Sequence, residues 1–490
     1  MNENKVVNKI ISPFVVVRKE HIGKKPVVFI YSFIGKELFE LVENWEIRTY
    51  EMINGQRTIN DIVDSIYNEF KINESDILNF INELTSFGII YIGRIPKLNK
   101  ITKFGNSPDI HKAFLDAICI FGLKNLSFPI RARLLLTLRC NLDCSFCYVK
   151  SGKPYRKIST DEMSTNQIKV IIDEVSKKGT FIMDISGGEP FLRKDIIEVL
   201  AYATNKIPIV YVLTNGIILS DKEIARSLKK AVKNNLLFIQ ISLNEDHEDV
   251  SQNSELGANF EKVINGIKNT IACKLNININ TAVTKHNLHN LENIVSLTHK
   301  LGIKRHTFSE FLPVACGKDE IKDLLCTPYE YFKLQNEIIP RLQKKFPDME
   351  LIGKIIEPEF WNDARKKIPN APTYGSCAAY TTDITIGPDG KVLPCAWFAA
   401  FPEFYGPNVT DNEIANIWKE DELIKKIRKI QIKGKCERCE FNQLCYKGCL
   451  ALKYSLYKKL TIPDVKCWYL PGVPSSRKPP RKITNTFLIE

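Results

Sequence analysis

Two patterns of apolar and polar residues divide the chain. Between residues 131 and 328, short apolar runs alternate with longer segments in which apolar residues recur every three or four positions, as in strands followed by helices. The candidate strands are Arg133–Leu138, Phe181–Ser186, Ile209–Leu213, Leu237–Leu243, Asn276–Val283 and Lys304–Phe308. These strand–helix units predict an α/β fold, a parallel sheet that is open or curved into a partial (β/α)6 barrel. We expect the functional residues to lie at the carboxyl ends of its strands.

Residues 1–95 have a different pattern, which predicts a small α+β unit. Thr58 with Asp61 three residues later is the start signal of a helix, and Gly88 is the end signal of another. Short runs of β-branched and aromatic residues mark the strands. The expected elements are strands Val27–Tyr31 and Leu38–Val42, helices Trp45–Ile53, Ile59–Phe70 and Glu74–Phe87, and a last strand Ile89–Ile92.

The other segments complete a plan of several domains. Residues 96–130 are predicted to be a linker with one helix around Ile110–Phe121, and residues 329–470 carry many cysteines among short elements. Residues 471–490 are Pro-rich and basic, which predicts a flexible tail. With 490 residues, 44% of them apolar and 26% charged, the chain has the composition of a globular protein of two or three domains.

Charge and hydropathy narrow the possible partners. The net charge of +13 comes from 69 basic and 56 acidic residues, and because the basic residues are dispersed, we do not expect a nucleic acid partner. No apolar run reaches the roughly 18 residues that span a bilayer, so no membrane partner is expected. The first residues lack a cleavage site, which predicts a cytoplasmic protein.

The cysteines indicate the chemistry. Fourteen cysteines in a cytoplasmic chain favour metal or iron–sulfur ligation over disulfides, because thiols stay reduced there. Cys140, Cys144 and Cys147 follow the first strand of the α/β region in the string LTLRCNLDCSFCY. Three thiolates at this spacing can hold three irons of a 4Fe–4S cluster and leave the fourth iron for a small molecule. A zinc knuckle is the alternative.

This loop resembles the signature of the radical SAM enzymes, in which an aromatic residue stands beside the third cysteine, as Phe146 and Tyr148 do. The resemblance continues after the next strand, in a turn that binds the amino group of S-adenosylmethionine in the family. Glycines there let the backbone approach a ligand, and a carboxylate can receive an ammonium group. The resemblance assigns the cofactor to Gly187, Gly188, Glu189, Pro190, Asn215, Ser242 and Tyr148. Asn and Ser at strand ends are also ordinary turn residues.

A second cysteine group resembles the seven-cysteine SPASM pattern, including Gly390 before its second cysteine and the segment from Gly406 to Trp418. Structural zinc is the alternative. By resemblance, one auxiliary 4Fe–4S cluster is held by Cys377, Cys395 and Cys449, and another by Cys436, Cys439, Cys445 and Cys467. The expected cofactors are therefore S-adenosylmethionine and three 4Fe–4S clusters, one catalytic and two auxiliary.

Two positions depart from the relatives. The fourth ligand of the first auxiliary cluster commonly lies just before Cys377, but residues 371–376 contain no cysteine. The ligand is then Cys316, Cys326 or no protein residue. In anaerobic sulfatase maturases an aspartate follows the second SPASM cysteine, whereas Ala396 follows Cys395 here, which disfavours that activity.

The N-terminal unit resembles the PqqD-like domains that recognise precursor peptides, above all in NGQRTINDIVDSIY and INELTSFGII. Winged-helix domains of this shape also bind DNA. However, the third predicted helix, Glu74–Phe87, contains acidic residues and no basic residue, and phosphates would repel it. Peptide recognition is therefore the favoured role.

Together these resemblances imply a radical SAM/SPASM peptide maturase, similar to sactisynthases and ranthipeptide synthases, that forms a thioether crosslink in a ribosomal precursor peptide. Carbon–carbon crosslinking, epimerisation and sulfatase-maturase-like oxidation are alternatives, and a zinc-stabilised binding protein is the alternative of another class. An electron donor such as flavodoxin or ferredoxin is the second expected partner. No pattern identifies a catalytic side chain, since the cofactor supplies the reactive species.

Overall fold

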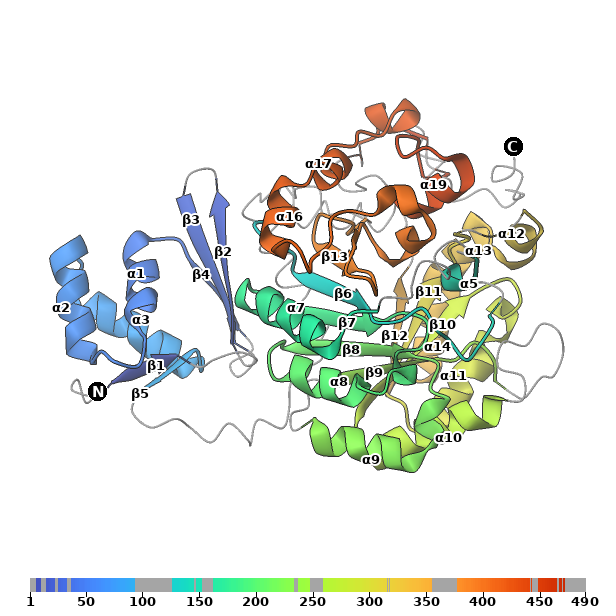
Figure 1. The fold of residues 1–490 in the computed structure, drawn as a ribbon, viewed down its shortest axis with the longest axis horizontal. Coiled ribbons are helices and arrows are strands. Elements are labelled where there is room, and N and C mark those ends of the chain that lie inside the picture. Colours follow the sequence, from blue (N-terminus) through green and yellow to red (C-terminus); the bar gives the residue numbers. More distant parts are fainter. Residues whose placement is uncertain are drawn as a thin grey trace.

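The computed structural model contains an N-terminal unit, a curved parallel sheet with outer helices and a C-terminal region (Figure 1). It describes residues 6–9, 15–22, 25–32, 37–92, 126–144, 147–151, 162–232, 237–246, 259–314, 316, 318–354, 377–440, 442, 448–464, 467–468 and 470–471. The predicted linker helix Ile110–Phe121 and the predicted tail after residue 471 lie outside this part of the chain. Among the described residues, no helix combines the length and apolarity needed to cross a membrane.

The N-terminal unit holds the three helices that were predicted and more strands than were predicted. Thr58 accepts a hydrogen bond from the Asp61 amide in a capping box, and Gly88 follows the last helix with a φ of 66°. Its elements are β1 (Val7–Lys9), β2 (Val15–Ile22), β3 (Lys25–Ser32), β4 (Glu37–Leu41), α1 (Asn44–Met52), α2 (Ile59–Phe70), α3 (Glu74–Ser86) and β5 (Ile90–Ile92).

In this unit, β2, β3 and β4 form an antiparallel sheet in that order, and β1 pairs with β5. Strands β1 and β2 were missed from the sequence. In β2 the charged residues Arg18 and Glu20 interrupt the apolar run of the sequence, yet they are only 2% and 1% exposed. The sheet is buried on both faces.

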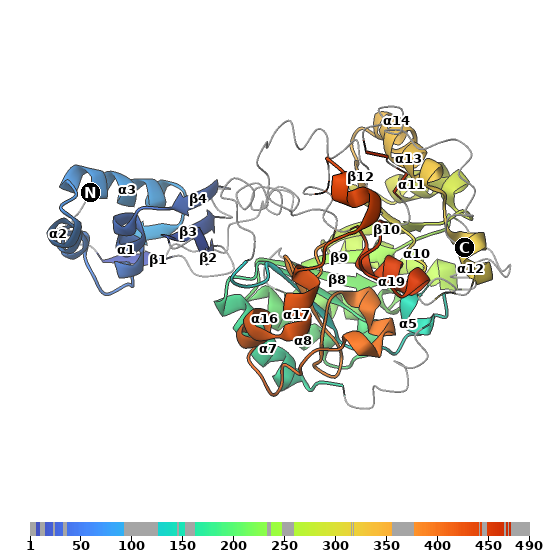
Figure 2. The ribbon, with the colours of Figure 1, turned by 90° about the horizontal axis from the view of Figure 1, so that it is seen from above.

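One face of the three-stranded sheet packs on helices α1 to α3, and the other face packs on the large sheet. The second contact joins β2 and β3 to the starts of the parallel strands, and the views agree that the two parts lie side by side (Figure 2). Its apolar residues are Val16, Val27, Phe29, Tyr31, Leu126, Ile130, Phe181, Ile182 and Ile209. The N-terminal unit therefore contacts the end of the sheet opposite to the cysteine loop.

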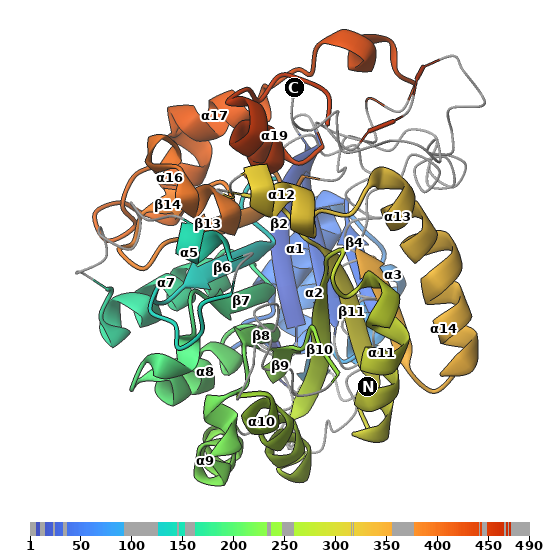
Figure 3. The ribbon, with the colours of Figure 1, turned by 90° about the vertical axis from the view of Figure 1, so that its right-hand side faces the viewer.

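The large sheet has nine strands in the order β12-β11-β10-β9-β8-β7-β6-β13-β14, parallel except for β14. Its strands follow an arc with helices on the outside, which is the predicted partial barrel (Figure 3). The strands are β6 (Arg131–Leu135), β7 (Ile182–Ser186), β8 (Ile209–Thr214), β9 (Leu237–Ser242), β10 (Asn276–Val283), β11 (Arg305–Glu310), β12 (Glu350–Lys354), β13 (Asp383–Ile386) and β14 (Val392–Leu393).

Amphipathic helices cover the outer face of this sheet. Alternate strand residues such as Leu134, Ile185 and Val212 form the main core with the apolar faces of α7 (Thr165–Lys177), α8 (Ile196–Thr204), α9 (Lys222–Ala231) and α10 (Phe260–Ala272). A separate core includes residues of α11 (Leu291–Lys300), α12 (Lys318–Leu324), α13 (Pro328–Lys333) and α14 (Ile339–Lys345). Short helices are α5 (Tyr148–Ser151), η2 (Pro190–Leu192), η3 (Ile218–Ser220), η5 (Leu288–Asn290) and η6 (Leu334–Ile338).

Two sequence predictions about the sheet need correction. The first strand ends at Leu135 and not at Leu138, because the next residues leave the sheet toward the cysteine loop. The strand rhythm also does not stop near Pro328, since β12 pairs in parallel with β11. Its sequence, ELIGK, has few β-branched residues and no clear alternation, so it was not recognised as a strand.

The C-terminal region continues the sheet. Strand β13 pairs in parallel with β6, and Trp418, which is buried, donates a hydrogen bond to the Leu126 carbonyl at 2.9 Å. Gly390 has a φ of 85°, and an added Cβ would lie 2.4 Å from Asn408 Oδ1. The remaining elements are η7 (Ala396–Ala400), η8 (Pro402–Phe404), α16 (Ile414–Glu420), α17 (Glu422–Arg428), η9 (Gly434–Arg438) and α19 (Leu450–Tyr457).

Candidate functional site

The first cysteine group lies on the loop that follows β6. The Cys147 amide donates to the Cys144 carbonyl at 3.2 Å, which folds the loop back on itself. Burial raises the pKa of Cys140, and the charges of Glu189 and Cys147 add to this effect. Phe146 lies outside the described residues. The loop thus lies at the carboxyl end of β6, where ligands bind in parallel sheets.

The Gly187–Pro190 turn, at the end of β7, packs directly against the start of the cysteine loop. The Gly188 amide donates to the Thr137 carbonyl at 2.7 Å, and the Glu189 amide donates to the Arg139 carbonyl at 2.8 Å. An added Cβ would lie 2.1 Å from Thr137 O at Gly187 and 2.3 Å from Arg139 O at Gly188. The glycines are therefore required by the neighbouring main chain, which the sequence argument about ligand approach did not foresee.

The side chain of Glu189 is wholly buried, with 0% exposure. Its carboxylate accepts hydrogen bonds from Thr214 Oγ1 at 2.8 Å, from the Asn215 amide at 2.8 Å and from the Phe191 amide at 3.0 Å. Burial raises the pKa of Glu189 to about 7, against the three hydrogen bonds, which lower it. Glu189 thus joins the turn to the end of β8.

Asn215 and Tyr148 lie against predicted cluster ligands. Asn215 Nδ2 is 4.0 Å from Cys140 Sγ and donates to Asn141 Oδ1 at 2.8 Å. The ring of Tyr148 packs on Trp397 with centroids 6.2 Å apart, and the charges of Cys147 and Cys395 help burial to raise its pKa. Tyr148 therefore bridges the two cysteine groups.

Ser242 is exposed at the carboxyl end of β9, one strand beyond β8 in the sheet. It is paired in register with Asn280 of β10. Its exposure at this end of the sheet leaves it accessible to a ligand bound over the strand ends.

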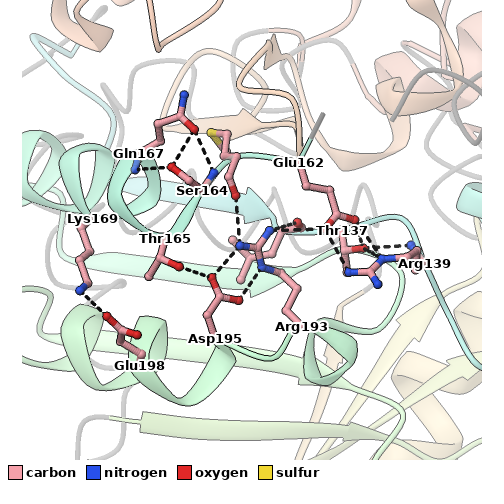
Figure 4. Close-up of polar contacts among 12 residues, drawn as sticks. Thr137, Arg139, Glu162, Ser164, Thr165, Gln167, Lys169, Arg193, Asp195 and Glu198 are labelled. Carbon is pink, nitrogen blue, oxygen red and sulfur yellow. Dashed lines mark hydrogen bonds and ion pairs between the residues drawn. The ribbon is translucent and has the colours of Figure 1, made fainter. Parts of the chain in front are cut away.

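A network of charged side chains flanks the cysteine loop (Figure 4), and no sequence pattern singles it out. It lines a cavity of about 340 Å³. Glu162 precedes α7 and forms ion pairs with Arg139 at 3.1 Å and with Arg193 at 3.5 Å. Arg193 follows the Gly187–Pro190 turn and is also paired with Asp195 at 2.7 Å. The network thus connects the cysteine loop with the turn.

The second cysteine group gathers from distant parts of the C-terminal region. Burial raises the pKa of Cys395 to about 12, with a contribution from the charge of Cys377. Burial likewise raises the pKa of Cys436 to about 11, with contributions from Cys467 and Cys439. Cys377 thus lies near Cys395, and Cys439 and Cys467 lie near Cys436. Cys445 lies outside the described residues.

A buried lysine lies near several of these thiols. Lys453 is 0% exposed and donates to the Ile462 carbonyl at 2.9 Å. Its pKa is lowered mainly by burial, while the charges of Asp464 and of Cys377, Cys436 and Cys449 oppose this shift. Asp464 also accepts a hydrogen bond from the Cys449 amide at 2.7 Å.

The two candidates for the missing ligand differ in burial. Cys326 is 1% exposed within a separate apolar core that includes residues of α11, α13 and α14, whereas Cys377, Cys395 and Cys449 pack against the main core. Cys316 packs against the same separate core but is less buried than Cys326, and Ser455 of α19 donates to the Pro313 carbonyl near it at 3.1 Å. Of the two thiols, that of Cys316 is thus the more accessible.

Comparisons with known proteins identify two domains. Residues 134–298 match the radical SAM superfamily, and residues 377–440 match the SPASM iron–sulfur cluster-binding domain. The chain is a radical SAM enzyme with a SPASM domain. Radical SAM domains bind S-adenosylmethionine and a 4Fe–4S cluster, and the SPASM domain binds auxiliary iron–sulfur clusters. These matches favour iron–sulfur clusters over zinc as the metal bound by the two cysteine groups.

The radical SAM enzyme has several curated relatives. It is 28% identical over 364 residues to the mycofactocin maturase MftC of Mycolicibacterium smegmatis, a match that covers 73% of this chain and 88% of the relative. It is 27% identical over 348 residues to the AdoMet-dependent heme synthase of Methanosarcina barkeri, covering 69% and 95%. A PqqA peptide cyclase of Granulibacter bethesdensis is 23% identical over 339 residues, covering 69% and 86%.

The fold is shared with a solved structure, that of Streptococcus suis SuiB bound to its precursor peptide SuiA. The TM-score is 0.69 at 18% sequence identity, and the match covers 94% of this chain and all of that chain, 100%. At this identity the likeness concerns the fold, including the N-terminal unit.

The residues of this chain fit iron–sulfur clusters. Both groups offer thiols, the soft ligands that such clusters use, and every cysteine within the described residues is free of a disulfide. Over the same residues, no three Cys, His, Asp or Glu side chains converge as they would on a single metal ion. Cys140, Cys144 and Cys147 would hold the catalytic cluster, with S-adenosylmethionine beside the Gly187–Pro190 turn.

Proposed function

We propose that this radical SAM enzyme modifies a ribosomally synthesised precursor peptide in the cytoplasm, with an electron donor such as flavodoxin or ferredoxin. When bound, the cluster and S-adenosylmethionine supply a 5′-deoxyadenosyl radical that removes a hydrogen atom from the substrate. The relatives include mycofactocin maturases and a PqqA peptide cyclase as well as AdoMet-dependent heme synthases. A feature of this chain must therefore favour a peptide.

The feature that carries the proposal is the edge of the N-terminal sheet. Strand β4 pairs with β3 on one side, and among the described residues no strand pairs with its other side. Phe39 of β4 packs on Phe87 at the end of α3, with centroids 4.8 Å apart. An unpaired strand beside a helix can take up an extended peptide through main-chain hydrogen bonds. A tetrapyrrole has no peptide main chain that could form such hydrogen bonds with the strand.

Hydrogen exchange tests this docking site. The precursor is sought as a short cysteine-containing reading frame beside the gene, and the peptide is added to the intact enzyme. We expect slower amide exchange in Glu37–Leu41, because added main-chain hydrogen bonds protect these amides. Strand β2 on the opposite edge is the control and should exchange at an unchanged rate. Modification of the peptide without protection of β4 would show that the N-terminal unit has another role.

We further propose that the product contains a thioether. Cys377, Cys395 and Cys449 provide three of the four thiolates that a 4Fe–4S cluster uses, so a substrate cysteine is a candidate for the fourth. Buried Lys453, which lies near Cys377 and Cys449, would favour an additional thiolate there because opposite charges attract in a region of low dielectric constant.

Mass spectrometry of the co-expressed precursor distinguishes the possible reactions. A thioether or a carbon–carbon crosslink removes two hydrogen atoms, and only a thioether also consumes a thiol. We expect the loss of two hydrogens together with one fewer site for alkylation by iodoacetamide. Loss of two hydrogens with all thiols still alkylated would indicate carbon–carbon crosslinking. An unchanged mass with uptake of solvent deuterium would indicate epimerisation.

A further inference from the structure

Glu162 touches both residues that lead into the first cysteine of the loop (Figure 4). Thr137 donates its hydroxyl proton to Glu162 Oε1. Arg139 donates from Nε to Glu162 Oε1 at 3.2 Å and from Nη2 to Oε2 at 3.1 Å. The side chain of Glu162 is 18% exposed and that of Arg139 is 61% exposed, so the bond from Thr137 is better shielded from water than the bonds from Arg139. Cys140 is the next residue of the chain.

Arg193 approaches the same carboxylate from the other segment. It follows the Gly187–Pro190 turn, is 8% exposed and lies 3.5 Å from Glu162 Oε2. Its guanidinium also donates to the carbonyls of Leu136 and Met163, each at 3.1 Å. Asp195 fixes its orientation with two hydrogen bonds, of 2.9 and 2.7 Å. Arg193 is therefore held rigidly between the turn, the cysteine loop and Glu162.

The main chain of the turn holds the same two residues. The carbonyls of Thr137 and Arg139 accept the hydrogen bonds from the Gly188 and Glu189 amides. Thr137 and Arg139 are thus bound by the turn through their main chains and by Glu162 through their side chains. A shift of Glu162 would move the segment that carries Cys140 relative to the turn beside which S-adenosylmethionine binds.

We propose that Glu162 is a positioning residue that sets the place of Cys140 relative to the Gly187–Pro190 turn, and so supports binding of S-adenosylmethionine to the cluster. The carboxylate acts through Thr137, Arg139 and Arg193. Charge-assisted hydrogen bonds are about twice as strong as neutral ones, so its negative charge matters as well as its shape. This role depends on the radical SAM assignment, and it is independent of which substrate is modified.

The variant Glu162→Gln tests the role of the charge, because glutamine keeps the size of the side chain. The reconstituted holoenzyme is reduced and titrated with S-adenosylmethionine by EPR. The spectral change on titration isolates the catalytic cluster, since the auxiliary clusters do not bind the cofactor. We expect about tenfold weaker binding, as for loss of a charge-assisted hydrogen bond, and a smaller spectral change at saturation. Iron content should equal that of the unchanged protein.

Glu198→Gln is the matched control. Glu198 lies in the same region and forms an ion pair with Lys169 at 2.5 Å. Within the described residues it forms no hydrogen bond or ion pair with Thr137 or Arg139. Its substitution makes the same chemical change and should leave the affinity for S-adenosylmethionine and the spectral change unaltered. Equal titrations of Glu162→Gln and of the unchanged enzyme would overturn the proposal.

Thr137 provides a second test in case Glu162→Gln folds poorly. Thr137→Ser keeps the hydroxyl and should bind S-adenosylmethionine as the unchanged enzyme does, whereas Thr137→Val loses the bond to Glu162 and should bind more weakly. A purely structural role predicts a different result, in which both Glu162→Gln and Thr137→Val lose iron and thermal stability while the remaining clusters bind S-adenosylmethionine normally. That result would also overturn the proposal.

Discussion

At Gly187, the absence of a side chain lets two segments of the site touch. The backbone has a φ of 141°, and a Cβ would lie 2.1 Å from the Thr137 carbonyl oxygen. The sequence argument gave the approach of a ligand as the reason for this glycine. In the structure its close neighbour is the segment that leads into the cysteine loop, about 50 residues earlier in the chain.

Gly187→Ala should therefore be strongly destabilising, by about 3 kcal/mol or more, since neither backbone can move away freely. Gly302→Ala is the control: Gly302 also has a positive φ, of 84°, but no atom lies within 4 Å of its added Cβ. It should cost about 1 to 2 kcal/mol, the strain of a left-handed residue alone. Urea unfolding of the iron-free protein measures the loss of stability in both variants. Equal losses would show that the structure relieves the close contact between the added Cβ at Gly187 and Thr137.

Single-residue variants test which group is the fourth ligand of the first auxiliary cluster. Cys316→Ala should alter the EPR spectrum of the auxiliary clusters if this thiol completes the cluster. Cys326→Ala should leave the spectrum unchanged, because Cys326 is buried in another core. If neither variant changes the spectrum but a cysteine-containing precursor does, the site is open to substrate. Loss of a cluster in Cys326→Ala would contradict the placement of this residue.

At the scale of elements, β11 is joined to its neighbours by a buried histidine. His306 is 0% exposed, hydrogen-bonds to Thr281 of β10 at 2.8 Å and to Thr298 of α11 at 3.2 Å, and stacks on Phe308. Burial lowers the pKa of His306 from 6.5 to about 3. The folded protein therefore keeps this ring neutral where the unfolded chain would protonate it.

This difference predicts a pH dependence of stability. Stability from neutral His306 is present above pH 6.5 and is lost as the pH falls toward 3, because the unfolded state then binds the additional proton. Between pH 7 and pH 5, the free energy of unfolding should fall by about 2 kcal/mol more than in His306→Gln. Urea unfolding at the two pH values measures this. Parallel decreases in both proteins would contradict a neutral buried ring.

At the scale of the whole molecule, buried charges fasten the N-terminal unit to the barrel. Arg18 donates to the carbonyls of Phe128, Pro129 and Gly179 at 2.6, 3.2 and 3.0 Å and pairs with Glu20 at 2.6 Å. Glu20 also accepts the Ser127 amide at 2.8 Å. Removal of the whole N-terminal unit would expose the apolar contact beneath it, so local changes are better tests of its role.

Arg18→Met should destabilise the protein by about 3 to 5 kcal/mol, because it leaves Glu20 buried without its cation. Lys19→Met on the same strand is the control. Lys19 is 65% exposed and pairs with Glu51 at the surface, so its loss should cost under about 1 kcal/mol. Urea unfolding and limited proteolysis compare the two variants. A small effect of Arg18→Met would mean that the two parts are joined mainly by the apolar contact.

The cluster content is a property of the whole chain. Three 4Fe–4S sites predict about 12 Fe per reconstituted chain. Replacing Cys140, Cys144 and Cys147 together by Ala should remove about a third of the iron and abolish reductive cleavage of S-adenosylmethionine. Cys273→Ala, at a position outside both cysteine groups, should keep iron and cleavage. Cleavage in the triple variant would mean that another group holds the catalytic cluster.

Features fixed by neighbouring residues could be predicted from the sequence. The spacing of the cysteines, the capping box at Thr58 and the alternation in the barrel strands depend on residues a few positions apart, so the pattern contains all the information needed. The radical SAM and SPASM matches confirm what the cysteine spacing implied.

Only the tertiary structure decided the partners of charged and buried groups. Arg18 and Glu162 look like surface charges in the sequence, but their partners lie up to 161 and 31 residues away. Cys316 and Cys326 were equivalent as candidate ligands in the sequence, and only the fold shows that Cys326 is buried inside an apolar core while Cys316 lies at its edge. A charge or a thiol has the same sequence signature whether it is solvated or buried. Its role depends on which distant segments fold against it.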